Sequence, residues 1–147
     1  MVVRLFKPEL RLAKLVNEPG GRTLTAAIAE AERRVESVRE DATAEIDTSI
    51  GRMAEALRSG AWLEKDTLYP LADWIFGMAG TLKLTELSQA AYSLCALLSR
   101  QAPPPTAREV ELHVSTLRAL RRPELAGDAA ARKNVLAGLR KLAAPER

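Results

Sequence analysis

Apolar residues spaced three or four positions apart dominate the first half of the chain. They run from residue 24 to residue 57, and the opposite face carries acids and arginines. The apolar positions are Leu24, Ile28, Ala31, Val35, Val38, Ala42, Ile46, Ile50, Met53 and Leu57. This spacing is typical of an amphipathic α-helix. At 1.5 Å per residue the helix would be about 50 Å long, and Ser59 and Gly60 would end it.

Shorter helices are predicted on either side of the long one. Pro8–Val16 reads as a short helix that ends in a turn at residues 17–21. A helix with Asp66 or Thr67 as its N-cap would carry Pro70 in its first turn, where a missing N–H does no harm. Another helix starts near Thr85 and ends before the proline-rich link at residues 101–105.

The C-terminal part begins with a capping-box pattern, Thr106-Ala107-Arg108-Glu109, which opens a helix that stops at Pro123. Residues 124–147 contain Asp128 as a possible cap, and the sequence leaves open whether they form a fifth helix or a frayed tail. No stretch alternates with the period of a strand, so the fold class is all-α. Short connections between amphipathic helices favour an up-and-down four-helix bundle.

We expect one helical domain over residues 1–147. Its parts would be an N-terminal helix and turn (1–21), a bundle core (22–122) and a basic C-terminal helix or tail (123–147). The long helix has about twice the reach of its successors, so part of its apolar stripe needs a cover. The N-terminal helix or a second copy of the chain could provide it, which leaves a homodimer open.

Composition narrows the function classes. The chain has 147 residues, 47% hydrophobic and 28% charged, and a net charge of +3, with basic and acidic residues intermixed over most of its length. We therefore do not expect a nucleic-acid partner. One cysteine and one histidine are too few for a structural zinc site, and no cofactor or metal is expected. The chain lacks a signal-peptide pattern or membrane-length apolar run, so we expect a cytoplasmic protein with no membrane partner.

One helix carries an unusual polar line. With Ile75 at the centre of the buried face, Asp66, Asp73, Gly77 and Gly80 fall on the opposite side. A glycine inside a helix costs about 1 kcal/mol relative to alanine, so two of them indicate a place where another molecule approaches the backbone. Trp74 and Phe76 lie on the two flanks of this line, so we expect at least one large aromatic ring at the surface beside it, and Tyr69 belongs to the same exposed stripe. Such a surface suits docking better than catalysis.

The stretch Asp73-Trp74-Ile75-Phe76-Gly77-Met78-Ala79-Gly80-Thr81-Leu82-Lys83 resembles the signature of histidine-containing phosphotransfer (HPt) domains, His-x-Leu-Lys-Gly-x-Ala-x-x-Leu-Gly. The similarity covers residues 68–100. Asp73 stands where the family has its phosphorylated histidine, Phe76 stands at the lysine, and Lys83 stands at the second glycine. The apolar and small positions agree, whereas both chemical positions differ.

This resemblance implies an adaptor, sink or inhibitor that binds a response-regulator receiver domain or a histidine kinase in bacterial two-component signalling. Phosphotransfer needs an imidazole nucleophile and a cation beside the phosphate, and Asp73 and Phe76 supply neither. The partner-binding residues would be Asp66, Tyr69, Asp73, Phe76, Gly77 and Gly80. The Tyr92-Ser93-Leu94-Cys95 helix and the Asn17-Glu18-Pro19-Gly20-Gly21 turn also look like those of the small CheE-type proteins of bacterial chemotaxis.

Two enzymatic alternatives stay open. Glu86 and Gln89, three residues apart on one helix, could hold a water in line with an aspartyl phosphate, as in receiver phosphatases. His113 could be a displaced phosphoacceptor, with Arg118 near the phosphate, although a partly buried residue at the boundary of the core is the simpler interpretation. Cys95 has no basic neighbour to lower its pKa, so we expect a small core residue and not a nucleophile.

Overall fold

The computed structural model describes residues 20–21, 23–64 and 66–143 of the chain. These residues form six α-helices and one 3₁₀ turn and contain no strand, which confirms the all-α prediction. The chain divides into two compact units, Met1–Val38 and Arg39–Arg147. The predicted helix at Pro8–Val16 lies outside the described residues.

Helix α2 (Leu24–Ser59) begins and ends where the apolar period predicts. The Thr23 hydroxyl accepts a hydrogen bond from the Ala26 N–H at 3.2 Å and caps its first turn. Gly60 ends the helix with φ +80°, a left-handed conformation that glycine adopts without strain. In the first unit, the apolar side chains of α2 are exposed, including Leu24, Ile28, Val35 and Val38.

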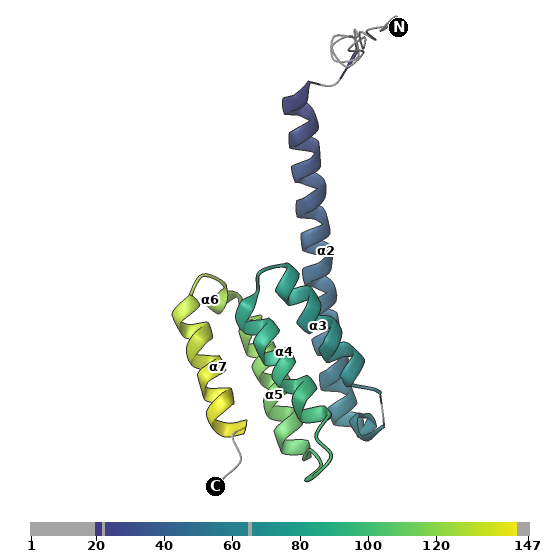
Figure 1. Cartoon of the computed structure of the whole chain (residues 1–147), viewed down its shortest axis with the longest axis vertical. Coiled ribbons are helices and arrows are strands. Elements are labelled where there is room, and N and C mark those ends of the chain that lie inside the picture. The colour runs from purple at the N-terminus through teal and green to yellow at the C-terminus, as the bar shows by residue number, and fades with distance from the viewer. Residues whose placement is uncertain (1–19, 22, 65, 144–147) are drawn as a thin grey trace, which may run out of the picture. The chain divides into compact units, whose positions relative to one another are not determined.

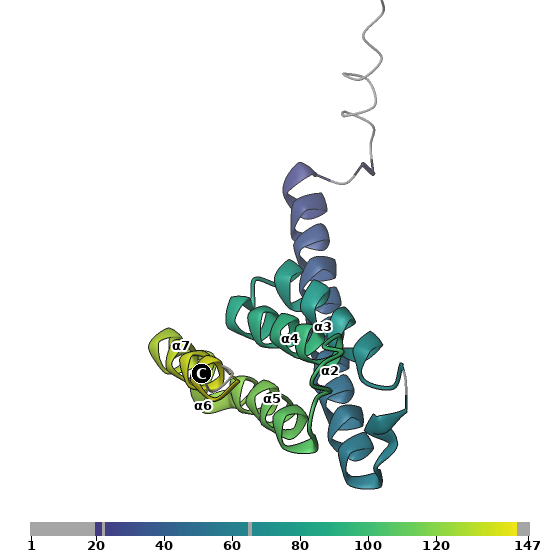
Figure 2. The same cartoon turned by 60° about the horizontal axis from the view of Figure 1, so that its bottom comes forward.

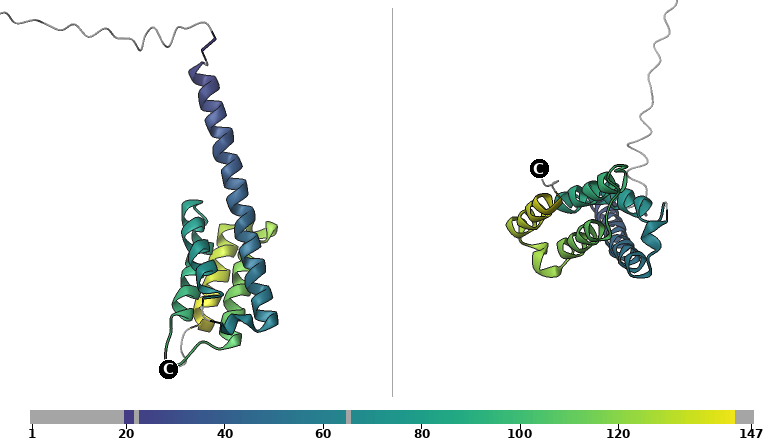
Figure 3. Two further views of the ribbon diagram at one scale, coloured as in Figure 1. Left: turned by 90° about the vertical axis from the view of Figure 1, so that its right-hand side faces the viewer. Right: turned by 90° about the horizontal axis from the view of Figure 1, so that it is seen from below.

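The second unit contains the rest of α2 and all later elements. After the 3₁₀ turn η1 (Ala61–Leu63) come the following helices: α3 (Tyr69–Thr81), α4 (Thr85–Leu98), α5 (Ala107–Leu120), α6 (Pro123–Ala126) and α7 (Ala129–Ala143). Helices α3, α4 and α5 lie side by side in that order, and α7 packs against α4 and α5 (Figures 1 and 2). The short helix α6 connects α5 to α7 at the edge of this unit, as the view from below shows (Figure 3).

A single core lies between these helices. Its fully buried members include Ile46 and Met53 from α2, Ile75 from α3, Leu94 from α4 and Leu117 from α5. Leu136 and Leu139 place α7 in the same core. Residues 129–143 are therefore a packed helix and not a frayed tail, and Asp128 caps it by accepting from the Ala131 N–H at 2.9 Å. Both tryptophans, Trp62 and Trp74, are partly buried against this core.

Helix α3 starts later than predicted. Asp66 has φ +71° and does not cap the helix; Leu68 occupies the N-cap position and makes no side-chain cap hydrogen bond. Pro70 lies in the first turn, as expected. The prediction of Asp66 or Thr67 as the N-cap is wrong because the chain turns at Asp66, and Leu68 is then buried at 2% exposure.

The predicted capping box at the start of α5 is confirmed. Thr106 accepts from the Glu109 N–H at 3.3 Å, and the Glu109 carboxylate accepts from the Thr106 N–H at 2.8 Å. Arg100 donates to both oxygens of the same carboxylate at 2.9 Å. The Thr106 hydroxyl also donates to this carboxylate at 2.8 Å. These bonds lower the pKa of Glu109 to about 2, and the two bonds that Thr106 donates are the main cause. The carboxylate therefore ties the end of the proline-rich link to the first turn of α5.

Candidate functional site

The six residues predicted to bind a partner all lie exposed on the second unit. Asp66 is in the turn before α3, and Tyr69, Asp73, Phe76, Gly77 and Gly80 follow along that helix. We call these six residues the α3 surface. Helical periodicity correctly predicted that Asp73, Gly77 and Gly80 are exposed while Ile75 is fully buried, whereas Asp66 lies before the helix and its exposure has another cause.

Gly77 has no packing partner that would require a glycine. A Cβ built at this position meets no other described atom within 4 Å, apart from its own helix backbone and its chain neighbours. At Gly80 a Cβ would meet only the Ser88 hydroxyl at 3.5 Å, an ordinary contact. Because glycine in a helix interior costs about 1 kcal/mol relative to alanine, internal packing does not account for Gly77.

An aromatic pair borders the glycines. Phe76 is 40% exposed and Tyr92 on α4 is 61% exposed. Their ring centroids are 5.5 Å apart and the rings are tilted by 48°. Tyr92 was absent from the predicted binding residues. It could have been found by folding α3 and α4 as an antiparallel pair about Leu84, since positions 76 and 92 are equally distant from that turn.

The turn between α3 and α4 fixes the α3 surface in place. The Leu84 N–H bonds to the Ala79 carbonyl at 2.8 Å, and the Lys83 N–H bonds to the Gly80 carbonyl at 3.1 Å. These are the two bonds of a Schellman motif, whose left-handed residue is Lys83 at φ +61°. Ser88 also donates to the Phe76 carbonyl at 3.0 Å. The backbone beneath Phe76 is thus held by α4.

The Cys95 thiol lies behind this surface and is 7% exposed. Burial raises its pKa to about 11, with a smaller contribution from the negative charge of Asp73. A thiol with this pKa is protonated at neutral pH, so it is not an activated nucleophile. The prediction of a small core residue is confirmed.

His113 is buried on α5, with 1% of its surface exposed. Its Nδ1 lies 2.7 Å from the Glu109 carbonyl oxygen, and its Nε2 lies 3.0 Å from the Ser93 hydroxyl on α4. Since a carbonyl can only accept, Nδ1 carries the proton and Ser93 donates to Nε2. Burial lowers the pKa of His113, which favours the neutral ring. Both nitrogens are engaged, so an incoming phosphoryl group finds neither of them free.

Glu86 and Gln89 face α7. The Glu86 carboxylate lies 3.5 Å from Nε of Arg132, and only 14% of the Glu86 side chain is exposed. The Gln89 amide oxygen accepts from Arg140 at 2.9 Å. Glu86 is therefore held by an arginine of α7 in a mostly buried position, whereas Gln89 bonds to Arg140 at the exposed surface.

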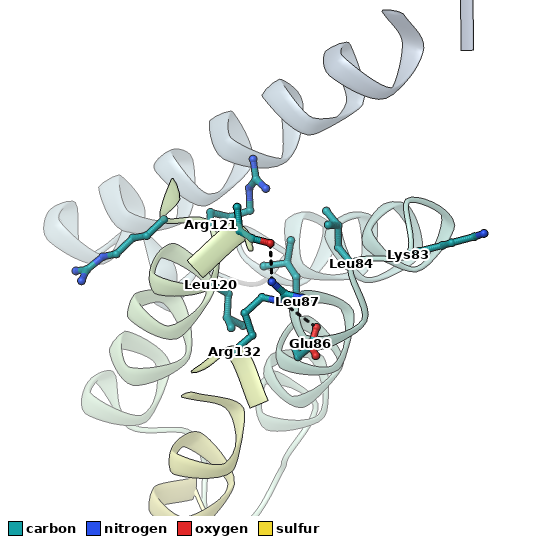
Figure 4. Close-up of a pocket in the computed structure, with 9 residues that line it drawn as sticks. Lys83, Leu84, Glu86, Leu87, Leu120, Arg121 and Arg132 are labelled. Carbon is teal, nitrogen blue, oxygen red and sulfur yellow. Dashed lines mark hydrogen bonds and ion pairs between the residues drawn. The ribbon is translucent and has the colours of Figure 1, made fainter. Parts of the chain in front are cut away.

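A small cavity lies beside Glu86. It has a volume of about 150 Å³ and is lined by Lys83, Leu84, Glu86, Leu87, Leu120, Arg121, Arg122, Ala126 and Arg132. Figure 4 shows Arg132 reaching Glu86, while the side chain of Lys83 points away from the cavity. Arg132 also donates to the carbonyls of Leu125 and Ala126 at 2.7 Å. Arg121 pairs with Asp47 on α2 at 2.7 Å. Both arginines therefore already have partners within the chain.

We also searched the part of the chain that the structure describes for metal sites and for membrane-spanning helices. There, no three His, Cys, Asp or Glu side chains are grouped so that they could hold a metal ion. None of the described helices combines the length and the apolar character needed to cross a bilayer. No protein-family model, curated protein or solved structure matches the chain.

Proposed function

We propose that the chain is an HPt-like four-helix bundle with extra helices, which binds a response-regulator receiver domain or a histidine kinase through the α3 surface without transferring phosphate. It would act as an adaptor, sink or inhibitor in bacterial two-component signalling of the chemotaxis type. The bundle would consist of the second-unit part of α2 with α3, α4 and α5. Tyr92 joins the contact because its ring lies against Phe76.

The observation that carries this proposal is the bare backbone at Gly77 beside the exposed rings of Phe76 and Tyr92. The position is exposed, lies inside a helix and leaves space for a Cβ. A glycine there weakens the helix and improves no contact with the other described residues. Glycine would be favoured at this position if another molecule packs directly against the helix backbone, because no side chain would stand between them.

The neighbouring side chains have the composition of a protein-binding surface. Exposed aromatic rings are enriched at the centres of interfaces, and Tyr69, Phe76 and Tyr92 supply three of them. Asp66 and Asp73 at the same surface favour a partner with basic groups at matching positions. The Schellman turn and the Ser88 bond hold this backbone before binding, which lowers the ordering cost of association.

Phosphotransfer is not part of the proposal. The exposed groups at the two chemical positions are a carboxylate, Asp73, and an aromatic ring, Phe76. A carboxylate forms an acyl phosphate only where cations and oriented donors stabilise it, and the described residues hold no acidic cluster for a metal. The His113 ring is enclosed between α4 and α5.

A binding assay with paired glycine variants tests the docking surface. We expect Gly77→Arg to abolish binding to purified receiver and kinase domains, because the long side chain would stand between the partner and the helix. Gly51→Arg is the matched control: Gly51 is also exposed, helical and open at its Cβ position, but it lies on α2. Circular dichroism should show similar helix content for both variants. Undiminished binding by Gly77→Arg would contradict the proposal.

A label-transfer assay tests the absence of phosphotransfer. The wild-type chain is incubated with a radiolabelled phosphorylated kinase and its receiver, and the label on each protein is followed. We expect no label on this chain. Acid-labile label that disappears in His113→Gln would instead support the histidine alternative, and faster loss from the receiver that Gln89→Ala abolishes would support the phosphatase alternative.

A further inference from the structure

The exposed part of α2 in the first unit carries a heptad repeat. Leu24, Ile28, Ala31, Val35 and Val38 alternate steps of four and three, which is the spacing of core positions in a coiled coil. In heptad notation Ile28 and Val35 take the a positions, and the other three take the d positions. All five are exposed, with Leu24 at 77% and Val35 at 69%. A stripe of this kind on one helix needs a second helix to bury it.

We propose that this stripe binds a second copy of the chain in an antiparallel pair, in which Ile28 faces Ala31 of the second copy and Leu24 faces Val35 of the second copy. The inference is independent of the α3 surface. An antiparallel pair of helices places each a position opposite a d position. In this register each layer from Leu24 to Val35 combines one larger and one smaller side chain and occurs twice by symmetry, while Val38 lies beyond the overlap.

Charge disfavours the parallel arrangement. In a parallel pair, the residue at g faces the residue at e five positions further along the second copy. That rule places Arg34 beside Arg39 of the second copy, twice in the dimer, and like charges across an interface oppose association. A parallel pair would also stack Ala31 on Ala31, which leaves a thin layer in the middle of the stripe.

The proposed antiparallel register avoids like-charge contacts. Its flanking pairs are Thr25 with Glu32 and Ala27 with Arg34 of the second copy. Sliding the helices by one heptad would place Glu32 against Glu32 and Arg34 against Arg34, so this alternative register is disfavoured. In the structure, Arg34 already pairs with Glu30 of its own helix at 3.0 Å. A slide by two heptads would pair Glu32 with Arg39 of the second copy, but it would place Ile28 opposite Glu45, so the apolar layers and the charges together favour the proposed register.

The overlap is short. Residues 24–35 span about 18 Å, which is less than the three to four heptads of an independently stable coiled coil. We therefore expect a weak dimer that exchanges subunits readily. The N-terminal residues 1–19 are the competing cover for the same stripe, and their attachment just before Thr23 makes them a natural alternative to test.

Disulfide trapping distinguishes these cases. In a Cys95→Ala background, the single variants Ile28→Cys and Ala31→Cys are oxidised mildly, alone and as a mixture in which one variant carries a size tag. We expect a covalent dimer of the two different chains in the mixture and little dimer of either variant alone. Efficient self-linking of Ala31→Cys would show a parallel pair and overturn the proposal.

Analytical ultracentrifugation of the full-length wild-type chain provides the second readout. The average mass should rise with concentration, and Ile28→Glu should raise the dissociation constant at least about tenfold, because it places a charge in an apolar layer. Ser37→Glu, on the exposed polar face of α2, is the matched control and should dimerise like the wild type. A wild-type chain that stays monomeric at high concentration, with no disulfide in the mixture, would overturn the proposal and favour residues 1–19 as the cover.

Discussion

The two ends of α2 show the same sequence pattern in different surroundings. Apolar residues step by three or four throughout, yet Val35 and Val38 are 69% and 66% exposed, whereas Ile46 and Met53 are fully buried. In the second unit, α3, α4 and α5 contribute to the core that covers the pattern. The comparison teaches that periodicity determines which face of a helix is apolar but leaves open which element covers that face.

The sharpest test of this difference is a pair of isoleucine truncations. Ile46→Ala should destabilise the second unit by about 2–5 kcal/mol, because Ile46 is fully buried and the substitution leaves a cavity. Ile28→Ala should change stability by roughly 0.5 kcal/mol, since its side chain is half exposed. Urea unfolding followed by far-ultraviolet circular dichroism measures both. Equal effects would contradict the distinction between the two ends of the helix.

Acid should weaken the second unit through His113. Its pKa is lowered from 6.5 by burial, so below pH 6.5 the unfolded chain binds a proton that the folded chain does not. Above pH 6.5 the neutral His113 makes its full contribution to the free energy of unfolding. This contribution decreases as the pH falls from 6.5 toward the lowered pKa, by at most about 1.4 kcal/mol per pH unit. Denaturation midpoints at pH 7.5 and 5.5 measure the effect.

His113→Leu is the control for this pH dependence. It should remove most of the loss between pH 6.5 and 5.5, while Glu109, whose pKa is about 2, contributes only at lower pH. An unchanged slope in His113→Leu would show that another group causes the loss.

Helix caps provide a comparison of intermediate size. Thr106→Ala should destabilise the second unit by about 1 kcal/mol, because Thr106 exchanges hydrogen bonds with Glu109 at the start of a packed helix. Thr23→Ala should only fray the first turn of α2, where residue 26 is alanine and offers no reciprocal bond. Denaturation and amide hydrogen exchange measure these effects. A lower free energy of unfolding of the second unit in Thr23→Ala would show that the start of α2 and the second unit unfold cooperatively.

The smallest expected effect is an increase in stability when a glycine of the α3 surface is replaced. Gly77→Ala should stabilise the second unit by about 0.5–1 kcal/mol, since alanine is the better helix former and its methyl group enters open space. Gly60→Ala should destabilise it, because Gly60 has φ +80°. Thermal unfolding measures both signs. A loss of stability in Gly77→Ala would mean that internal packing requires the glycine.

Helix positions were largely predictable from sequence, and the exceptions have local causes. The apolar period, the Ser59-Gly60 stop and the Thr106 capping box each act within a few residues, so they can be read directly from the sequence. Asp66 was misplaced because a left-handed turn at that residue competes with its use as a cap. The sequence does not distinguish the short helix α6 from a simple helix stop, because Pro123 both ends the preceding helix and fits the first turn of a new one.

Features of the candidate site that depend on distant residues were harder to predict. The exposure of Gly77 and Phe76 follows from the period of one helix. The contact of Tyr92 with Phe76, the arginines of α7 on Glu86 and Gln89, and the enclosure of His113 by Ser93 all depend on how separate helices pack. A single sequence contains no local signal for such pairings.

The placement of the indole rings gives this protein a selective optical reporter. Both tryptophans lie at the edge of the core in the second unit, and the sequence has none before residue 62. Fluorescence emission will therefore follow the melting of that unit alone, while far-ultraviolet dichroism also records the helical turns of residues 24–38. A mismatch between the two signals on heating would reveal non-cooperative unfolding in an unlabelled sample.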